Sequence, residues 1–247
     1  MNLLIISDLH IDTCDSFGAF QWDEMEFISQ VERIRDQYNI DKVVFNGDIF
    51  ELLKYSYDEI SRANPVLIGY FGSKDFIFIK GNHDMVNDFG RDSVQFINSA
   101  GQKIYIEHGH NADWFNGSRF GRVIGKMGFS VLKKMSNSKY LMNLYFSIVT
   151  KGEQINHIPK RYDTLKYLIY ALKLLKEHDT VILGHTHKLE SHHTYYLNNK
   201  KRYLNCGTCS MGRFQGIVLD TESMKYELIR ETTDSIRAGY EYMQVTG

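Results

Sequence analysis

Short apolar runs recur along this chain, and each one ends in a turn of polar residues. The runs cover residues 3–6, 43–45, 76–79, 104–106 and 181–183. Continuous apolar runs of this length, bounded by glycine or polar residues, are typical of strands that are buried on both faces of a sheet. The pattern therefore predicts at least one sheet with buried central strands.

Helical spacing of apolar residues separates several of these predicted strands. Residues 27–38 and 160–176 repeat apolar positions with a period near 3.6, and residues 89–100 favour a further short helix. Alternation of strands and helices predicts an α/β fold with a mostly parallel sheet and helices on its faces. The apolar stripe of the 160–176 segment consists of Leu165, Leu168, Ile169, Leu172 and Leu175.

After the predicted strand at 180–183, which leads to His185 and His187, the pattern changes to antiparallel hairpins. Residues 194–197 and 202–205 flank a polar turn at 198–200, and two further strands are predicted at 216–219 and 225–229. The chain therefore combines a parallel βαβ part with a C-terminal part of hairpins.

Each buried strand is followed by carboxylate, imidazole or amide side chains. Because ligands bind outside the carboxyl ends of strands in open α/β sheets, we expect these turns to converge on one site. Carboxylates and imidazoles together bind divalent transition metals, and two such ions can hydrolyse a phosphoester through a shared hydroxide. The turns are Asp8-Leu9-His10, Gly47-Asp48, Gly81-Asn82-His83-Asp84, His108-Gly109-His110 and Gly184-His185-Thr186-His187.

Composition favours one soluble domain, residues 1–247, in the cytoplasm. A chain of 247 residues with 43% hydrophobic content is long enough to bury a full core. The net charge of −1 gives no overall field that would attract nucleic acid, so we expect no nucleic-acid partner. Three cysteines favour a reducing compartment. The first apolar run lacks a basic flank and is predicted to be a strand, not a signal peptide.

A basic and apolar segment interrupts the motif series. Residues 114–152 contain no Asp or Glu, and Arg119, Arg122 and Lys126 share one face of a predicted amphipathic helix. We predict a helical cap at about residues 114–176. Two interpretations stay open: the cations form an ordinary solvated face, or they bind a substrate diphosphate or an anionic membrane surface.

The order of the motifs resembles that of the calcineurin-like metallophosphoesterase superfamily. The resemblance runs from Asp8 to about Gly207, and every ligand position is filled. It implies a four-layer αββα sandwich, hydrolysis of phosphoesters and a centre of two divalent metal ions. We expect Mn²⁺, with Fe or Zn as alternatives.

The resemblance also implies how the site residues divide their roles. His83 is not a ligand; it is expected to act as a general acid or as a donor to the phosphoryl oxygens. Either Glu51 or Asp84 would accept a hydrogen bond from its ring. His110 and Asp113 either contact substrate or support His108. The first ion would be held by Asp8, His10, Asp48 and His187, and the second by Asp48, Asn82, His108 and His185.

The substrate expectation rests on a narrower similarity. Gly47-Asp48-Ile49-Phe50-Glu51 is similar to the corresponding motif of UDP-2,3-diacylglucosamine pyrophosphatases of lipid A synthesis, which also carry a basic helical cap. This implies a lipid nucleotide diphosphate as substrate and a location peripheral to the inner membrane. His110 departs from the best-known members, which have Asp there. The alternatives are a phosphodiesterase or phosphatase for a water-soluble substrate and a non-catalytic protein-binding scaffold.

Overall fold

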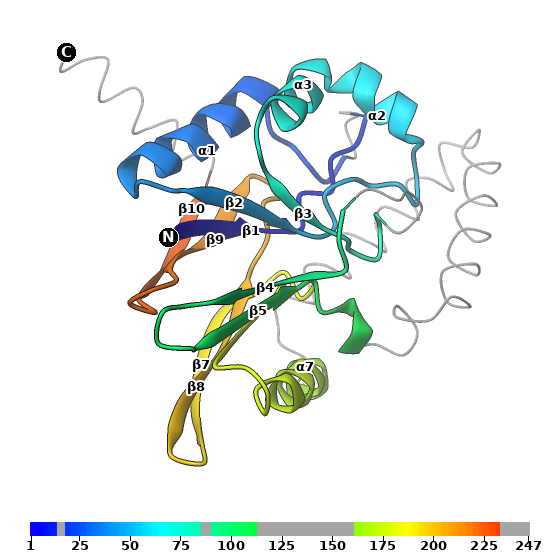
Figure 1. The fold of residues 1–247 in the computed structure, drawn as a ribbon. Coiled ribbons are helices and arrows are strands. Elements are labelled where there is room, and N and C mark those ends of the chain that lie inside the picture. Colours follow the sequence, from blue (N-terminus) through cyan, green and yellow to red (C-terminus); the bar gives the residue numbers. More distant parts are fainter. Residues whose placement is uncertain (14–17, 85–89, 113–160, 233–247) are drawn as a thin grey trace.

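Two five-stranded sheets form the centre of the molecule, and helices cover their outer faces (Figure 1). The computed structural model describes residues 1–13, 18–84, 90–112 and 161–232, with the side chains of 161–164 excepted. All structural statements below concern these residues.

The first sheet has the order β10-β9-β1-β2-β3. Within it β1, β2 and β3 are parallel, whereas β9 and β10 run antiparallel to their neighbours. Its strands are β1 (Asn2–Ile6), β2 (Lys42–Asn46), β3 (Ile77–Ile79), β9 (Arg213–Asp220) and β10 (Tyr226–Thr232).

The second sheet has the order β4-β5-β6-β8-β7. Its three central strands are parallel, and the edge strands β4 and β7 are antiparallel to their neighbours. Its strands are β4 (Ser93–Ile97), β5 (Lys103–Glu107), β6 (Thr180–Leu183), β7 (Leu189–Tyr196) and β8 (Asn199–Cys206).

Helices complete four layers in the order α, β, β, α. Helices α1 (Glu24–Gln37), α2 (Tyr57–Ala63) and α3 (Pro65–Ser73) contribute buried residues to the core on the outer face of the first sheet. Helix α7 (Arg161–Leu174) packs on the outer face of the second sheet, and the short 3₁₀ helix η1 (His110–Ala112) follows β5. The predicted αββα sandwich is confirmed.

The apolar runs are continuous because their strands are buried on both faces. In β1, Leu3 and Ile5 pack between the two sheets, while Leu4 and Ile6 pack toward α1. All four side chains are fully buried. Side chains of a strand alternate between its faces, so a strand between two cores needs apolar residues at every position.

Helix α7 corrects the predicted extent of the cap. The sequence placed residues 160–176 within the cap, but Ala171 and Leu175 pack with buried residues of β6 and β8, so α7 belongs to the sandwich. The predicted apolar stripe is divided between two faces: Leu165, Ile169 and Leu172 are exposed. The rest of the predicted cap, including Arg119, Arg122 and Lys126, lies outside the described residues.

The predicted helix over residues 89–100 is wrong. Its described part contains the edge strand β4, which pairs with β5. Val94 and Phe96 are partly buried against the core between the sheets, while Gln95 and Ile97 are exposed. This two-residue alternation is the period of a strand with one buried face.

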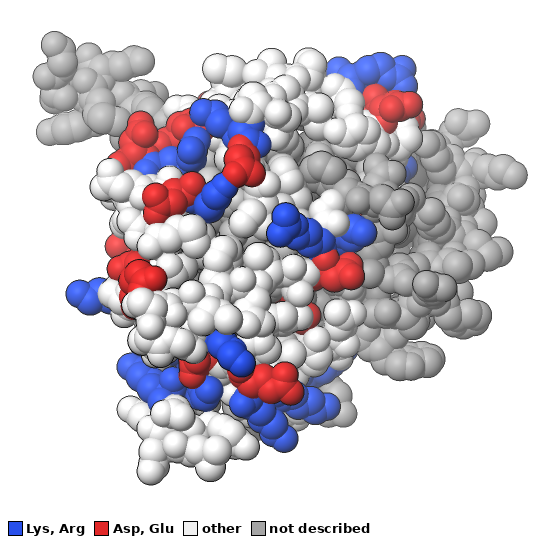
Figure 2. Space-filling view, in the orientation of Figure 1, with Lys and Arg blue, Asp and Glu red and all other residues white. Residues whose placement is uncertain are grey.

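Charged side chains of both signs are interspersed on the face shown in Figure 2. No helix among the described residues is long and apolar enough to span a bilayer.

Candidate metal centre

Turns that lie far apart in sequence are hydrogen-bonded to one another at the carboxyl ends of the parallel strands. The backbone N–H of Asp8 donates to Gly47 O at 3.0 Å, and that of Gly184 donates to His108 O at 2.9 Å. The backbone N–H of His185 donates to Asp8 Oδ2 at 3.0 Å. The turns after β1, β2, β5 and β6 therefore meet, as the sequence predicted.

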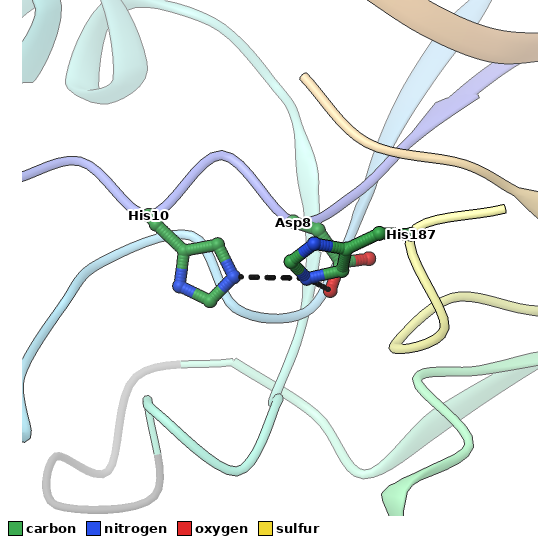
Figure 3. A group of neighbouring side chains, drawn as sticks. All are labelled: Asp8, His10 and His187. Atoms are coloured by element: carbon green, nitrogen blue, oxygen red, sulfur yellow. Dashed lines mark hydrogen bonds and ion pairs between the residues drawn. The ribbon is translucent and has the colours of Figure 1, made fainter. Parts of the chain in front are cut away.

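One group of candidate ligands consists of Asp8, His10 and His187, whose donor atoms all lie within 4.8 Å of one another. The Nε2 atoms of His10 and His187 are 3.3 Å apart, and His187 Nε2 lies 3.2 Å from Asp8 Oδ1 (Figure 3). The two rings point toward each other from separate loops, with the carboxylate beside them. This geometry suits a shared metal ion.

A second group consists of Asp48, His108 and His185, again within 4.8 Å. His108 Nε2 lies 3.1 Å from Asp48 Oδ2, and the rings of His108 and His185 are 5.1 Å apart. Asp48 also belongs to a third group with His10 and His83. It therefore lies where a carboxylate can bridge the two sites.

Three buried atoms fit the expected ligand set. Among the described residues, Asp8 Oδ1, Asn82 Oδ1 and His108 Nε2 form no hydrogen bond of good geometry. Asp8 Oδ1 and His108 Nε2 make only ion-pair contacts, with His187 at 3.2 Å and with Asp48 at 3.1 Å. Buried polar atoms normally find a hydrogen-bond partner, because leaving one unpaired is costly. Each of these atoms comes from a different predicted turn and is of a type that ligates divalent metals.

The ligand histidines are oriented by acceptors behind them. His108 Nδ1 is hydrogen-bonded to Asn46 O at 2.8 Å. His10 Nδ1 makes a longer ion-pair contact with Glu51 Oε2 at 3.4 Å, without hydrogen-bond geometry. A hydrogen bond from one ring nitrogen fixes the tautomer and leaves the other nitrogen for a metal. In both residues the Nε2 atom faces the cluster.

The backbone at this site is strained. Non-glycine residues with positive φ are uncommon, and those that persist concentrate at functional sites. Five of the seven predicted ligands have positive φ: Asp8 (55°), His10 (52°), Asp48 (51°), His185 (68°) and His187 (55°).

Two motif glycines permit the close approach of the turns. A Cβ at Gly81 would lie 2.0 Å from Asp48 Oδ1, and one at Gly47 would lie 2.5 Å from the ring of His108. Gly47 also has φ of 85°. Larger residues at either position would displace a candidate ligand.

His83 lies beside the ligands with its ring fixed. Its Nδ1 is 2.7 Å from Glu51 Oε1, and its ring packs edge-on against that of His10 with centroids 4.7 Å apart. Burial opposes the protonated form, but Glu51 and Asp48 raise the pKa of His83 to about 9.

Glu51, and not Asp84, is the acceptor for His83. The Asp84 carboxylate accepts the backbone N–H groups of Ile49, Phe50 and Gly81, and so holds two motif turns together. Burial and the nearby Asp48 raise the pKa of Asp84 to about 6, against the effect of these hydrogen bonds. The sequence predicts Asp84 as one of two acceptors that would serve His83 in catalysis, but its contacts are those of a positioning residue.

The cluster stabilises positive charge. Burial alone would raise the pKa of Asp8, but His108 and His187 lower it to about 2. Burial opposes a protonated His108, yet Asp48 and Asp8 raise its pKa to about 10. Burial and His108 together lower the pKa of His185 to about 3. Two buried carboxylates thus create a site that favours cations.

Sequence patterns missed the contribution of α7. The ring of Tyr167 is buried and lies 5.6 Å from the ring of His185, and the ammonium of Lys166 lies 5.5 Å above the Tyr167 ring. No motif marks either residue. His110 is buried with its ring 5.7 Å from that of His108, and Asp113 lies outside the described residues.

Comparisons with known proteins agree with this geometry. The sequence model of a family described as calcineurin-like phosphoesterase matches residues 1–189. No curated protein matches the sequence at a significant level.

Solved structures resemble the fold at low sequence identity. A hypothetical protein from Pyrococcus horikoshii OT3 is 11% identical, with 98% of this chain and 93% of that chain covered and a TM-score of 0.54, which supports the fold. A novel archaeal phosphodiesterase is 18% identical, with 94% and 100% covered and a TM-score of 0.46. A dimetal phosphatase from Danio rerio is 10% identical, with 93% and 98% covered and a TM-score of 0.46.

Proposed function

The chain belongs to the calcineurin-like phosphoesterase family, and from this premise we propose that it hydrolyses a lipid nucleotide diphosphate of the UDP-2,3-diacylglucosamine type. Membership makes it a metal-dependent phosphoester hydrolase with a two-metal centre. The lipid nucleotide is the finer proposal.

The position and contacts of Glu51 are the main support for this proposal. It completes the Gly47–Glu51 motif that is similar to the lipid A pyrophosphatases. Its carboxylate is buried and contacts both His83 and the candidate ligand His10. The motif residue on which the substrate similarity depends therefore lies within the site, which supports the proposal.

Seven residues would hold the ions, for which we propose Mn²⁺, with Fe or Zn as alternatives. When bound, two divalent ions polarise the phosphoryl group and lower the pKa of water. The ligand set is Asp8, His10, Asp48 and His187 for one ion and Asp48, Asn82, His108 and His185 for the other.

His83 has the geometry to protonate the leaving oxygen. Glu51 holds Nδ1, which leaves Nε2 for the substrate, and the side chain is 21% exposed. On cleavage of the phosphorus–oxygen bond, the leaving oxygen would take the proton from Nε2. A proton donor in position contributes roughly 10²–10⁴-fold to the rate.

Hydrolysis of two substrates tests the proposal. The Mn²⁺-loaded protein should release UMP from UDP-2,3-diacylglucosamine with a much higher kcat/KM than it shows on bis-p-nitrophenyl phosphate. Hydrolysis of the aryl diester with no turnover of the lipid nucleotide would favour the alternative, a phosphodiesterase or phosphatase for a water-soluble substrate.

The cap cations provide a second test, since we propose that Arg119, Arg122 and Lys126 bind the anionic substrate. Reversing Arg122 and Lys126 to Glu should raise KM strongly for the lipid nucleotide and leave hydrolysis of the aryl diester nearly unchanged. Equal losses on both substrates would indicate damage to the fold. No loss on either would mean that the basic face is solvated.

A further inference from the structure

The tip of the β7–β8 hairpin exposes large apolar side chains. Leu197 is 80% exposed and Tyr195 is 73% exposed, the highest values among the large hydrophobic residues that the structure describes. Tyr196 beside them is 42% exposed. The hairpin projects from the lower edge of the second sheet in Figure 1.

This tip is remote from the metal centre. Strand β7 begins at Leu189, just after His187, and its partner strand ends at Cys206, while Tyr196 and Asn199 pair at the opposite end. Strands of this length span roughly 25 Å. The tip therefore plays no part in holding metal ions.

The residue at the turn is unsuited to its backbone. Leu197 and Asn198 have φ of 49° and 63°. A two-residue hairpin loop with positive φ at both positions favours Asn and Gly, because a side chain with a bulky Cβ substituent is strained there. Leu197 is thus exposed to water and strained at once. Neither burial nor turn chemistry within the chain accounts for a leucine at this position.

The apolar groups lie on both faces of the hairpin. Tyr195 and Tyr196 are consecutive strand residues, so their side chains point to opposite faces, with Leu197 at the end. A flat partner surface would contact one tyrosine and leave the other in water. The interfacial region of a bilayer would surround the tip and contact all three side chains. Tyrosine is enriched at this interface in membrane proteins.

Cations outnumber acidic residues around the tip. Residues 191–219 contain no Asp or Glu. Lys200 is exposed, whereas Lys201 is buried and pairs with Asp179. Lys201 also donates to His178 O, which places the end of α7 and the residues after it, with exposed Lys173, Lys176 and Glu177, beside the hairpin. Figure 2 shows the uncharged tip at the bottom, with Lys and Arg side chains above it and acidic ones among them.

These charges distinguish between partners. A second copy docked hairpin to hairpin would bring two acid-free segments together, and their cations would repel. Anionic lipid headgroups complement them instead. We propose that the β7–β8 tip inserts into the headgroup region of an anionic phospholipid bilayer and anchors the enzyme there.

Binding to vesicles tests this proposal. We expect the full chain to bind vesicles of phosphatidylcholine with phosphatidylglycerol more tightly than vesicles of phosphatidylcholine alone. The double variant Tyr195→Ser, Leu197→Asn should lower the partition coefficient roughly tenfold or more. Lys200→Gln should lower it roughly fivefold, and added salt should remove that difference. Hydrolysis of a soluble aryl diester should be unchanged in all of them.

A matched control separates the tip from general surface hydrophobicity. Ile97→Thr removes another exposed aliphatic group, 61% exposed on β4, and should leave vesicle binding as in the wild type. Equal binding by the wild type and the double variant would overturn the proposal. A wild-type dimer that dissociates in the double variant would also overturn it, because the tip would then be a contact between copies of the chain. The same holds if the double variant loses binding to a single-stranded oligonucleotide and keeps binding to vesicles.

Fluorescence locates the tip directly. Leu197→Trp places an indole at the turn, and its emission, after subtraction of the wild-type spectrum, should shift to the blue with anionic vesicles. Brominated lipids should then quench it. An indole that stays fully accessible to an aqueous quencher on bound vesicles would contradict insertion of the tip.

Discussion

The metal-centre turns and the β7–β8 turn both contain non-glycine residues in the left-handed backbone region, but their surroundings differ. Asp8 is fully buried, and its carboxylate accepts hydrogen bonds from Ser7 Oγ and from the backbone N–H of His185. Leu197 is 80% exposed. Strain at the metal centre is held by a network inside the protein, whereas strain at the tip has no comparable support from the residues that the structure describes. Four substitutions test this difference between the metal centre and the hairpin tip.

The largest effect should come from Asp48→Ala. Asp48 belongs to two of the candidate ligand groups, so its loss should weaken both ions and reduce kcat/KM by at least ~10⁴-fold. Ion binding to the native state also raises stability, by about 2.7 kcal/mol at a free ion concentration 100 times Kd. Mn²⁺ should therefore raise the Tm of the wild type and leave that of Asp48→Ala nearly unchanged. A variant that still binds two ions by elemental analysis would contradict the bridging role.

His83→Ala should cost less and act differently. The residue lies beside the ligands without being assigned to an ion, so both ions should remain while kcat falls roughly 10²–10⁴-fold. Glu51→Gln serves as its matched partner, because it weakens the orientation of His83 without removing the ring. A loss of about 10–100-fold is expected there. Loss of metal from a normally folded His83→Ala protein would show that His83 is a ligand.

Gly81→Ala should have a smaller effect on stability and metal binding, which arises only from the steric clash of the added Cβ. The new Cβ would lie 2.0 Å from Asp48 Oδ1 and 2.1 Å from Asp48 N, so the turn must shift. We expect about 1–3 kcal/mol of destabilisation by urea unfolding, with weaker Mn²⁺ binding. The control is Gly72→Ala in α3, where nothing lies within 4 Å of the added Cβ. It should stabilise the protein by about 0.5–1 kcal/mol and leave metal binding intact.

The convergence of the turns could be predicted because it depends on residue types at strand ends. Asp8, Asp48 and His108 each follow a buried apolar strand, and parallel strands bring such ends to one edge. Two buried cores around β1 also explain why its apolar run was easy to identify. These features are local in sequence, and the parallel topology of the strands then brings the turns together.

Other features could not be predicted because they depend on three-dimensional approach. The sequence does not show whether Glu51 or Asp84 accepts a hydrogen bond from His83. In the structure the Asp84 carboxylate is occupied by backbone N–H groups, which leaves Glu51 as the acceptor. Tyr167 meets His185 because α7 packs on the second sheet, which no motif encodes. The edge strand β4 was mistaken for a helix because only Val94 and Phe96 mark its buried face.

Leu197→Asn should have the smallest effect, but it tests most directly whether the strain at the hairpin tip is supported within the protein. Asn tolerates positive φ better than Leu, so relief of strain at 49° should stabilise the isolated protein by about 1 kcal/mol. For a chain of this size that corresponds to a rise in Tm of about 2–4 °C. Leu197→Ala is the matched control, because it removes the exposed side chain without the local hydrogen bonding that lets Asn adopt positive φ, and its Tm should stay close to that of the wild type. A fall in Tm for Leu197→Asn would mean that the leucine is stabilised within the chain. A rise would show that the protein retains a residue that lowers its own stability, as expected if Leu197 is kept for contact with a partner outside the fold.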